Sequence, residues 1–297
     1  MPHSTRVEIA LALSSALLFA LGSVLTQRAG LDAPANRGGP LLVQMARRPV
    51  WLAGIASDAF GFVAQAAALG AGRLAVVQPL LVTSIVFALP LGVRLSGQRV
   101  RRSDVVAAAL VVLALVAFLL IATPSGGRSE APVKAWLLTG VVCGGLCAPL
   151  VALGRHGPPA RRAALLGCAT GVMFALAAAL TKAVVDELHR GIVQVIASWP
   201  PYALAVVGYA SMTLNQMALN TGALAATVAS STAVDPVASV VLGVVLFDES
   251  LSATAPATVI AIAALVVGLA AMAALARSEA HPMGSEPRPG AGAHTDD

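Results

Sequence analysis

The chain has 297 residues, of which 58% are hydrophobic and 11% are charged, and its formal net charge is +5. Soluble domains carry about 25% charged residues, so a water-soluble core cannot bury this much apolar surface. The composition therefore indicates an integral membrane protein. The positive charge does not indicate nucleic-acid binding, because the arginines lie in short loops between apolar segments, where they set orientation. The three cysteines lie inside apolar segments, which favours packing roles over a disulfide framework.

Nine apolar segments are each close to the roughly 20 residues that a helix needs to cross a bilayer. In chain order they are 7–26, 50–70, 74–95, 104–122, 133–153, 163–183, 201–220, 222–247 and 255–276. The third contains Pro79 and Pro90, which lipid-embedded helices tolerate where neighbouring helices satisfy the freed carbonyls. Lys182 ends the sixth, and we expect its ammonium group to extend to the interface. The sequence leaves open whether the connections 34–49 and 186–199 cross the membrane or lie at its surface.

One stretch of the chain recurs. Trp51–Val100, shifted by 151 positions without a gap, falls on Tyr202–Leu251, and about one position in five is identical. An upstream pair agrees at an offset of 155, where FALGSVLT (Phe19–Thr26) matches FALAAALT (Phe174–Thr181). Both copies have the same layout of an apolar span, a very short turn, a second apolar span and a polar turn. Internal repeats of apolar spans are typical of transporters whose substrate site lies between the halves.

The repeat divides the chain into four parts. These are a first repeat (1–122), a linker with an extra transmembrane helix (123–162), a second repeat (163–276) and a polar tail expected to be disordered (277–297). The extra crossing makes the second repeat inverted relative to the first. The sequence thus predicts an all-α polytopic membrane protein of about nine transmembrane helices, arranged four, one and four.

Positive charges predict the orientation of this chain. Six of the 19 Lys and Arg residues fall on the side of the N-terminus and thirteen on the other side. The more basic side is expected to face the cytoplasm. We therefore expect a multi-pass protein of the plasma membrane with its N-terminus outside and its C-terminus inside.

Glycines predict where helices approach one another closely. Gly92 and Gly243 are equivalent in the repeat, and each is expected to admit a neighbouring helix. Gly140 and Gly144 form a GxxxG pattern in the extra helix, whose small face can pack on another helix.

Two acidic residues lie within predicted spans, Asp58 in the second and Asp235 in the eighth. An acid at the bilayer centre costs at least about 2.5–3.5 kcal/mol on insertion scales, so each needs a reason to be there. Polar residues recur on the same helix faces and on one face of the seventh segment, and the repeat would bring these faces to one central cavity. The candidate substrate- or ion-binding residues are Asp58, Gln65, Gln216, Asn220, Ser231 and Asp235.

Structural roles compete with this interpretation. Asp235 precedes Pro236, which removes a backbone donor and is expected to interrupt the helix, so the carboxylate could instead cap the second half-helix. Asp58 could be buried in its protonated form and hydrogen-bonded to a hydroxyl group. Serines and threonines in membrane helices often serve packing.

The stretch SDAFGFVAQAAALGAGRLAVVQPL (57–80), the basic turn after the third segment and GRHG (154–157) resemble the NIPA-like proteins of the drug/metabolite transporter (DMT, EamA-like) superfamily. The resemblance covers nearly the whole chain in layout and in a few residues. It implies a secondary transporter, with Mg²⁺ as the candidate solute. The magnesium-linked members carry an acid near the position of Phe62, whereas this chain has its acid one turn earlier, at Asp58.

The sequence leaves three functions open. A carrier for Mg²⁺ would use Asp58 and Asp235 as metal ligands, with amide and hydroxyl groups holding the ion's waters. A proton-coupled exporter of a small metabolite or drug would use one aspartate to carry the coupling proton. A non-transporting membrane scaffold would need neither metal ligands nor a proton-carrying aspartate, and the internal repeat argues against this function.

An enzyme is not expected, because the sequence has no nucleophile–base pair, no HExxH motif and no phosphate-binding glycine loop. No cofactor is expected either. The expected partners are the lipid bilayer and a small-molecule or ion substrate, but not nucleic acid. Whether the chain forms a homodimer stays open.

Overall fold

The computed structural model describes residues 3–31, 48–96, 102–122, 124–127 and 131–251, together with residues 259 and 263. The predicted ninth span, the tail 277–297 and nearly all of the connection 34–49 lie outside the described residues.

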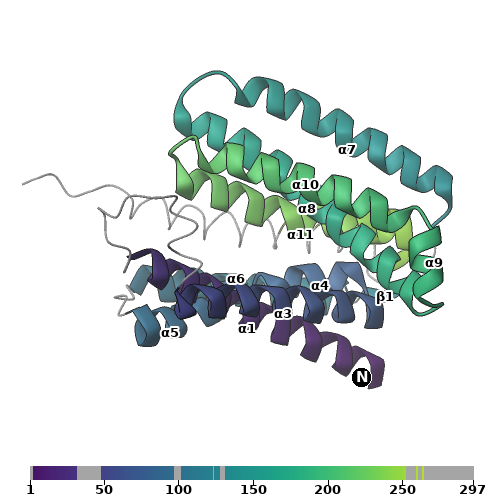
Figure 1. The fold of residues 1–297 in the computed structure, drawn as a ribbon, viewed down its shortest axis with the longest axis horizontal. Helices are drawn as coiled ribbons and strands as arrows, with labels where there is room; N and C mark the ends of the chain where they lie inside the picture. Colours follow the sequence, from purple (N-terminus) through teal and green to yellow (C-terminus); the bar gives the residue numbers. More distant parts are fainter. Residues whose placement is uncertain are drawn as a thin grey trace, which may run out of the picture.

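The helices form two layers that correspond to the two halves of the chain (Figure 1). The first-half layer contains α1 (His3–Leu31), α3 (Pro49–Ala71), α4 (Leu74–Leu81), α5 (Ser84–Ser96) and α6 (Arg102–Ala122). The second-half layer contains α7 (Val133–Gly154), α8 (Pro159–Leu188), α9 (Ile192–Ala197), α10 (Pro200–Leu219) and α11 (Leu224–Phe247). The layers meet where α8 and α11 contact α3 and α4.

Within the described residues, 6 helical segments are long and apolar enough to cross a membrane. They are Arg6–Ala29, Pro49–Ala71, Leu74–Leu95, Val133–Gly154, Pro159–Leu188 and Ala226–Phe247. The chain is therefore a multi-span membrane protein built almost entirely from helices, as its composition predicts.

The third predicted span is broken in the middle, between α4 and α5. Pro79 has no N–H group, and the chain then turns through shorter bonds, in which the Val82 N–H donates to the Pro79 carbonyl at 3.2 Å and the Thr83 N–H donates to the Leu80 carbonyl at 3.0 Å. By contrast, α11 runs without a break through Pro236. The prediction that Pro236 interrupts its helix is wrong, and the interruption follows Pro79 instead.

The connection 186–199 contains no helix long enough to cross the membrane by itself. Helix α8 continues to Leu188, and α9 has only 6 residues, which is about 9 Å at 1.5 Å per residue. Figure 1 places α9 at the end of the bundle where the N-terminus also lies.

A two-stranded ladder is the one element here that the all-α prediction lacked. Strand β1 (Pro124–Gly126), just after α6, pairs antiparallel with β2 (Glu249–Leu251), just after α11, with Ser125 opposite Ser250. Gly126 and Gly127 have φ values of 68° and 113°, which glycine adopts without strain. The linker between the halves is therefore tied to the segment that follows α11.

Glycines bring α8 and α11 together. A Cβ at Gly167 would lie 2.8 Å from the Thr227 carbonyl oxygen, and a Cβ at Gly171 would lie 2.8 Å from the Ser231 carbonyl oxygen. The GxxxG pattern that packs closely is thus Gly167–Gly171. A Cβ added at Gly140 or Gly144 would meet no described atom within 4 Å outside the adjoining part of its own helix, so the helix packing predicted for that pattern is not found among the described residues.

Candidate functional site

A cavity of about 830 Å³ lies between the two layers. Residues of α1, α3, α4 and α5 from the first half and of α8, α10 and α11 from the second half line it. Phe19, Phe62 and Phe174 contribute aromatic rings, and most of the remaining surface is aliphatic. The polar residues of the lining are Gln65, Gln78, Ser84, Thr181, Ser211, Ser231, Thr232 and Asp235.

Asp235 is the only acidic residue among the described residues that line the cavity. The Ser239 hydroxyl, one turn along α11, donates to Asp235 Oδ1 at 3.2 Å. Pro236 cannot donate to the carbonyl of Thr232, so that carbonyl lacks its usual helical partner beside the carboxylate. The close approach of α8 fixes this part of α11, since a Cβ at Gly171 would lie 3.0 Å from the Asp235 backbone nitrogen.

Gln78 is a buried amide in the same cavity. Its exposed fraction is 4%, and its Nε2 atom has no hydrogen-bond partner among the described residues. Leaving a buried donor unpaired costs about 1–3 kcal/mol, so such a group calls for an explanation. A hydrogen bond to a solute in the cavity would satisfy it.

Replacing Gln78 separates a binding role from a structural one. We expect Gln78→Leu to leave the melting temperature unchanged or higher, because it removes an unpaired buried amide that costs about 1–3 kcal/mol, and to weaken solute uptake. Gln216→Leu is the matched control, because Gln216 is an exposed amide on α10 outside the cavity. A lower melting temperature with normal uptake per folded molecule would contradict a role in binding.

Asp58 lies outside the cavity lining. It is half-buried on α3 beside Gly22 of α1, where a Cβ would overlap its carboxylate, and it is not among the residues that line the cavity. Phe62, one turn further along α3, lines the cavity and packs edge-on against Phe19, with ring centroids 4.9 Å apart. The structure therefore places only one of the two candidate metal ligands, Asp235, in the cavity.

Gln216 and Asn220 are exposed near the end of α10, outside the cavity lining. The Asn220 N–H donates to the Gln216 carbonyl at 2.9 Å and closes the last turn of the helix. Helix α10 turns Ser211 to the cavity instead. Of the six candidate residues, the structure brings together Gln65, Ser231 and Asp235.

The sequence contains a pattern that singles out Gln78. A polar residue directly precedes a proline within a span twice in this chain, as Gln78–Pro79 and as Asp235–Pro236. Both polar residues line the cavity. Ser211 and Thr181 carried no such signal, because isolated hydroxyl groups are common in membrane helices.

The described residues contain no group of three or more His, Cys, Asp or Glu side chains that could hold a metal ion. Mg²⁺ is usually bound through one or two carboxylates and keeps several waters. The cavity offers one carboxylate, that of Asp235, and the hydroxyls of Ser231 and Thr232 close to it in the sequence, in a largely apolar and aromatic surface. That donor set suits an organic solute better than a hard divalent cation.

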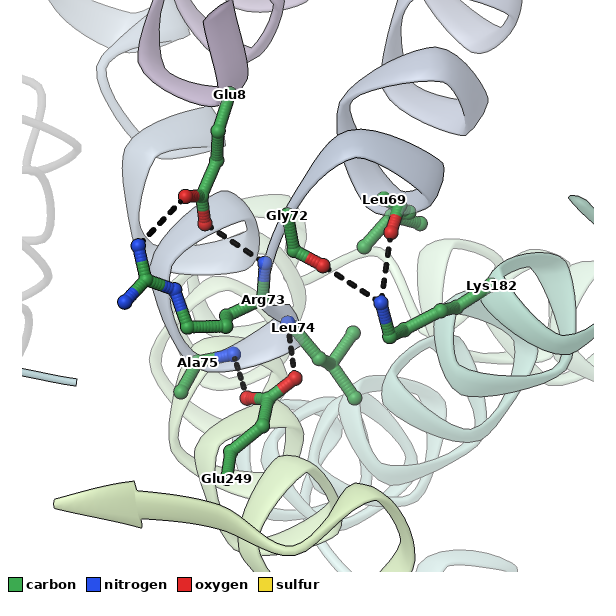
Figure 2. Close-up of polar contacts among 8 residues, drawn as sticks. All are labelled: Glu8, Leu69, Gly72, Arg73, Leu74, Ala75, Lys182 and Glu249. Atoms are coloured by element: carbon green, nitrogen blue, oxygen red, sulfur yellow. Dashed lines mark hydrogen bonds and ion pairs between the residues drawn. The ribbon is translucent and has the colours of Figure 1, made fainter. Parts of the chain in front are cut away.

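A second polar cluster lies at the end of the bundle that carries Glu8, which we call the Glu8 end (Figure 2). Glu8 is 1% exposed and accepts from the Arg73 N–H at 2.7 Å and from Arg73 Nη2 at 2.8 Å. Gly72 makes room for this contact, since a Cβ there would overlap the Glu8 carboxylate. Glu8 thus holds the turn between α3 and α4 from within the first half.

Glu249 holds the same turn from the second half (Figure 2). It is 1% exposed, and its two oxygens accept from the Leu74 N–H at 2.7 Å and from the Ala75 N–H at 2.8 Å. Burial raises the pKa of Glu249, against the lowering by these two bonds and by the Lys182 charge. A Cβ at Gly243 would overlap the carboxylate, so the close approach predicted at Gly243 is made by Glu249 and not by a helix alone.

Lys182 does not extend to the interface, and that prediction is wrong. It is 7% exposed, and its Nζ donates to the Leu69 carbonyl at 2.9 Å and to the Gly72 carbonyl at 2.6 Å (Figure 2). The same Nζ lies 5.4 Å from the centroid of the Phe247 ring. The carbonyls that α3 leaves unpaired at its C-terminus are better partners for the ammonium group than a distant aqueous surface.

Comparison with known proteins identifies a relative along the whole length. The chain is 32% identical over 292 residues to an uncharacterized protein of Corynebacterium glutamicum, and the alignment covers 96% of this chain and 99% of the relative. No protein-family model matches the chain, and no solved structure matches it.

Proposed function

This chain belongs to the same family as the Corynebacterium glutamicum protein, and we propose that it is a secondary transporter carrying a small organic solute through the cavity between its halves. The observation that carries this proposal is the cavity itself. Its volume of about 830 Å³ falls within the roughly 300–1,000 Å³ of small-molecule sites, and its lining is mostly apolar with a few polar groups, as such sites are.

The polar groups define the chemistry of the solute. Asp235 provides a carboxylate for a positively charged or hydrogen-bond-donating group, and the unpaired Gln78 amide provides a donor for an oxygen acceptor. Phe19, Phe62 and Phe174 suit an apolar body between these groups. As the only carboxylate among the described lining residues, Asp235 is also the candidate carrier of a coupling proton.

We also propose that the halves are inverted repeats of the DMT type. The packing supports this, because the first long helix of each repeat, α1 or α8, packs against the next two spans of its own repeat. The resemblance to NIPA-like proteins keeps Mg²⁺ as the alternative solute. A scaffold without transport activity remains the alternative of another class.

Uptake into proteoliposomes tests this proposal. The probes are isoamylamine, isocaproate and leucine, which share a branched apolar body, together with Mg²⁺, each measured with and without a pH gradient. We expect uptake of the probes that carry an amino group, because the Asp235 carboxyl group can accept a hydrogen bond from it, and we expect the pH gradient to accelerate this uptake. Uptake of Mg²⁺ alone would favour the cation carrier, and no uptake beyond protein-free vesicles would favour the scaffold.

Orientation is tested by single cysteines in a variant whose Cys143, Cys147 and Cys168 are alanine. His156→Cys lies in the exposed turn between α7 and α8, and Ile192→Cys lies in α9 at the opposite end of α8, where Ile192 is 63% exposed. We expect an impermeant reagent to label Ile192→Cys from outside the cell and His156→Cys only from the cytoplasmic side. Labelling of both from the same side would contradict the proposed topology.

A further inference from the structure

Two charged side chains of the second half hold one turn of the first half (Figure 2). Lys182 of α8 donates to the carbonyls of Leu69 and Gly72, at 2.9 and 2.6 Å. Glu249 of β2 accepts from the N–H groups of Leu74 and Ala75, at 2.7 and 2.8 Å. We call these four hydrogen bonds the clamp.

The signs of the charges fit the backbone that they bind. The C-terminus of α3 presents unpaired carbonyls with partial negative charge, and the N-terminus of α4 presents unpaired N–H groups with partial positive charge. The Lys182 ammonium group binds the carbonyls, and the Glu249 carboxylate binds the N–H groups. Both side chains are buried, so these bonds form in a region of low dielectric, where charge-assisted hydrogen bonds are strong.

The clamp lies next to the cavity. Gln78, one turn beyond Ala75 on α4, and Thr181, next to Lys182 on α8, both line it. Around the clamp, the two halves pack together through fully buried apolar side chains, namely Leu69, Leu74, Val77, Leu246 and Phe247. The clamp thus lies where the two halves meet beside the cavity.

We propose that the clamp is the gate that closes the cavity at the Glu8 end, and that this gate opens when the α3–α4 turn withdraws from Lys182 and Glu249. The gate rests on the proposed transport function, because it controls access to the same cavity. Opening breaks bonds between the halves only, whereas the bonds between Glu8 and Arg73 lie within the first half and stay intact. Lys182 and Glu249 remain together on the second half, where their opposite charges compensate each other.

Accessibility of a cysteine in the cavity tests this gate. The reporter is Ala177→Cys, a small residue of the lining, in the variant that lacks the three native cysteines. The protein is oriented in vesicles, and an impermeant thiol reagent is added only on the side of the membrane that the Glu8 end of the bundle faces. We expect Glu249→Gln and Lys182→Met each to raise the labelling rate about tenfold or more, because removing one partner of a buried charged contact disfavours the closed state.

Glu8→Gln is the matched control, since it removes an equally buried carboxylate from the same turn without breaking a bond between the halves. We expect its labelling rate to stay within about twofold of the parent, because it leaves the closed state in place. Unchanged labelling in folded Glu249→Gln and Lys182→Met, or an equal rise in Glu8→Gln, would overturn the gate. If neither clamp variant folds, Glu249→Asp, which keeps the charge and shortens the side chain, must raise labelling for the gate to stand.

Labelling does not depend on which solute is carried. A rise in labelling together with no uptake of any probe would reject the proposed transport function and keep the gated cavity. Solute uptake by the parent together with unchanged labelling in the clamp variants would reject the gate and keep the transporter.

Discussion

Asp235→Asn should abolish pH-driven uptake while the protein folds and melts normally. Asparagine keeps the shape of the side chain and can still accept from Ser239, whose hydroxyl lies 3.2 Å from Oδ1. It removes the negative charge and the titratable proton. We expect solute affinity to fall roughly 10- to 100-fold, because a hydrogen bond to a charged group contributes about 1.5–3 kcal/mol.

Three measurements on Asp235→Asn distinguish the functions that compete. A proton-coupled exporter loses pH-driven uptake but keeps solute exchange, because exchange needs no net movement of protons. A carrier for Mg²⁺ loses affinity for the ion, because a hard cation loses its charged ligand. A purely structural aspartate gives lower thermal stability with normal uptake per folded molecule.

Asp58→Asn is the matched control for this prediction. It makes the same chemical change on a membrane helix of the other half, at a residue that lies against Gly22 and outside the cavity lining. We expect its effect on uptake to be much smaller than that of Asp235→Asn. Equal losses in the two variants would show that the position of Asp235 in the cavity does not explain its role.

Gly171→Leu should prevent the second half from packing. A Cβ at this position would lie 2.8 Å from the Ser231 carbonyl oxygen, 2.9 Å from Val234 Cβ and 3.0 Å from the Asp235 nitrogen. Two of these atoms belong to the backbone of α11, which cannot move aside as a side chain can. Overpacking costs about 1–3 kcal/mol and sometimes more, so we expect a large fall in melting temperature and in the yield of folded protein.

Gly144→Leu is the control for this substitution, because it adds the same side chain to a membrane helix at a glycine where an added Cβ would meet no described atom of another helix within 4 Å. We expect this variant to fold with nearly the parent melting temperature. Similar damage from both substitutions would mean that leucine at any of these glycines is harmful, and the close contact between α8 and α11 would not be the cause. Melting temperatures in detergent, measured for both variants side by side, decide between the two.

For the described residues, the sequence by itself determined where most helices lie and that the chain spans the membrane several times. Both properties are local, because a run of apolar residues long enough to cross a bilayer must satisfy its own backbone hydrogen bonds within one helix. Asp235, Ser231 and Gln65 could also be found in this way, since a polar residue within a span is rare and costly.

The tertiary structure decided which polar groups meet. Gln216 and Gln65 look alike in the sequence, but only the rotation of α10 and α3 about their axes decides that Gln65 faces the cavity. Likewise, the GxxxG pattern at Gly167–Gly171 cannot be ranked above that at Gly140–Gly144 until the neighbouring helix is placed.

The charged cluster at the Glu8 end is the clearest case of contacts that the sequence alone does not predict. Lys182 lies 113 residues from Leu69, and Glu249 lies 175 residues from Leu74. A lysine at the end of a span ordinarily extends its charge to water. Lys182 instead binds the carbonyls at the end of α3, because the fold brings that helix end within reach, and a helix terminus without partners is a stronger attraction than the aqueous surface. No local pattern in the sequence contains that information, since it depends on how the two halves pack.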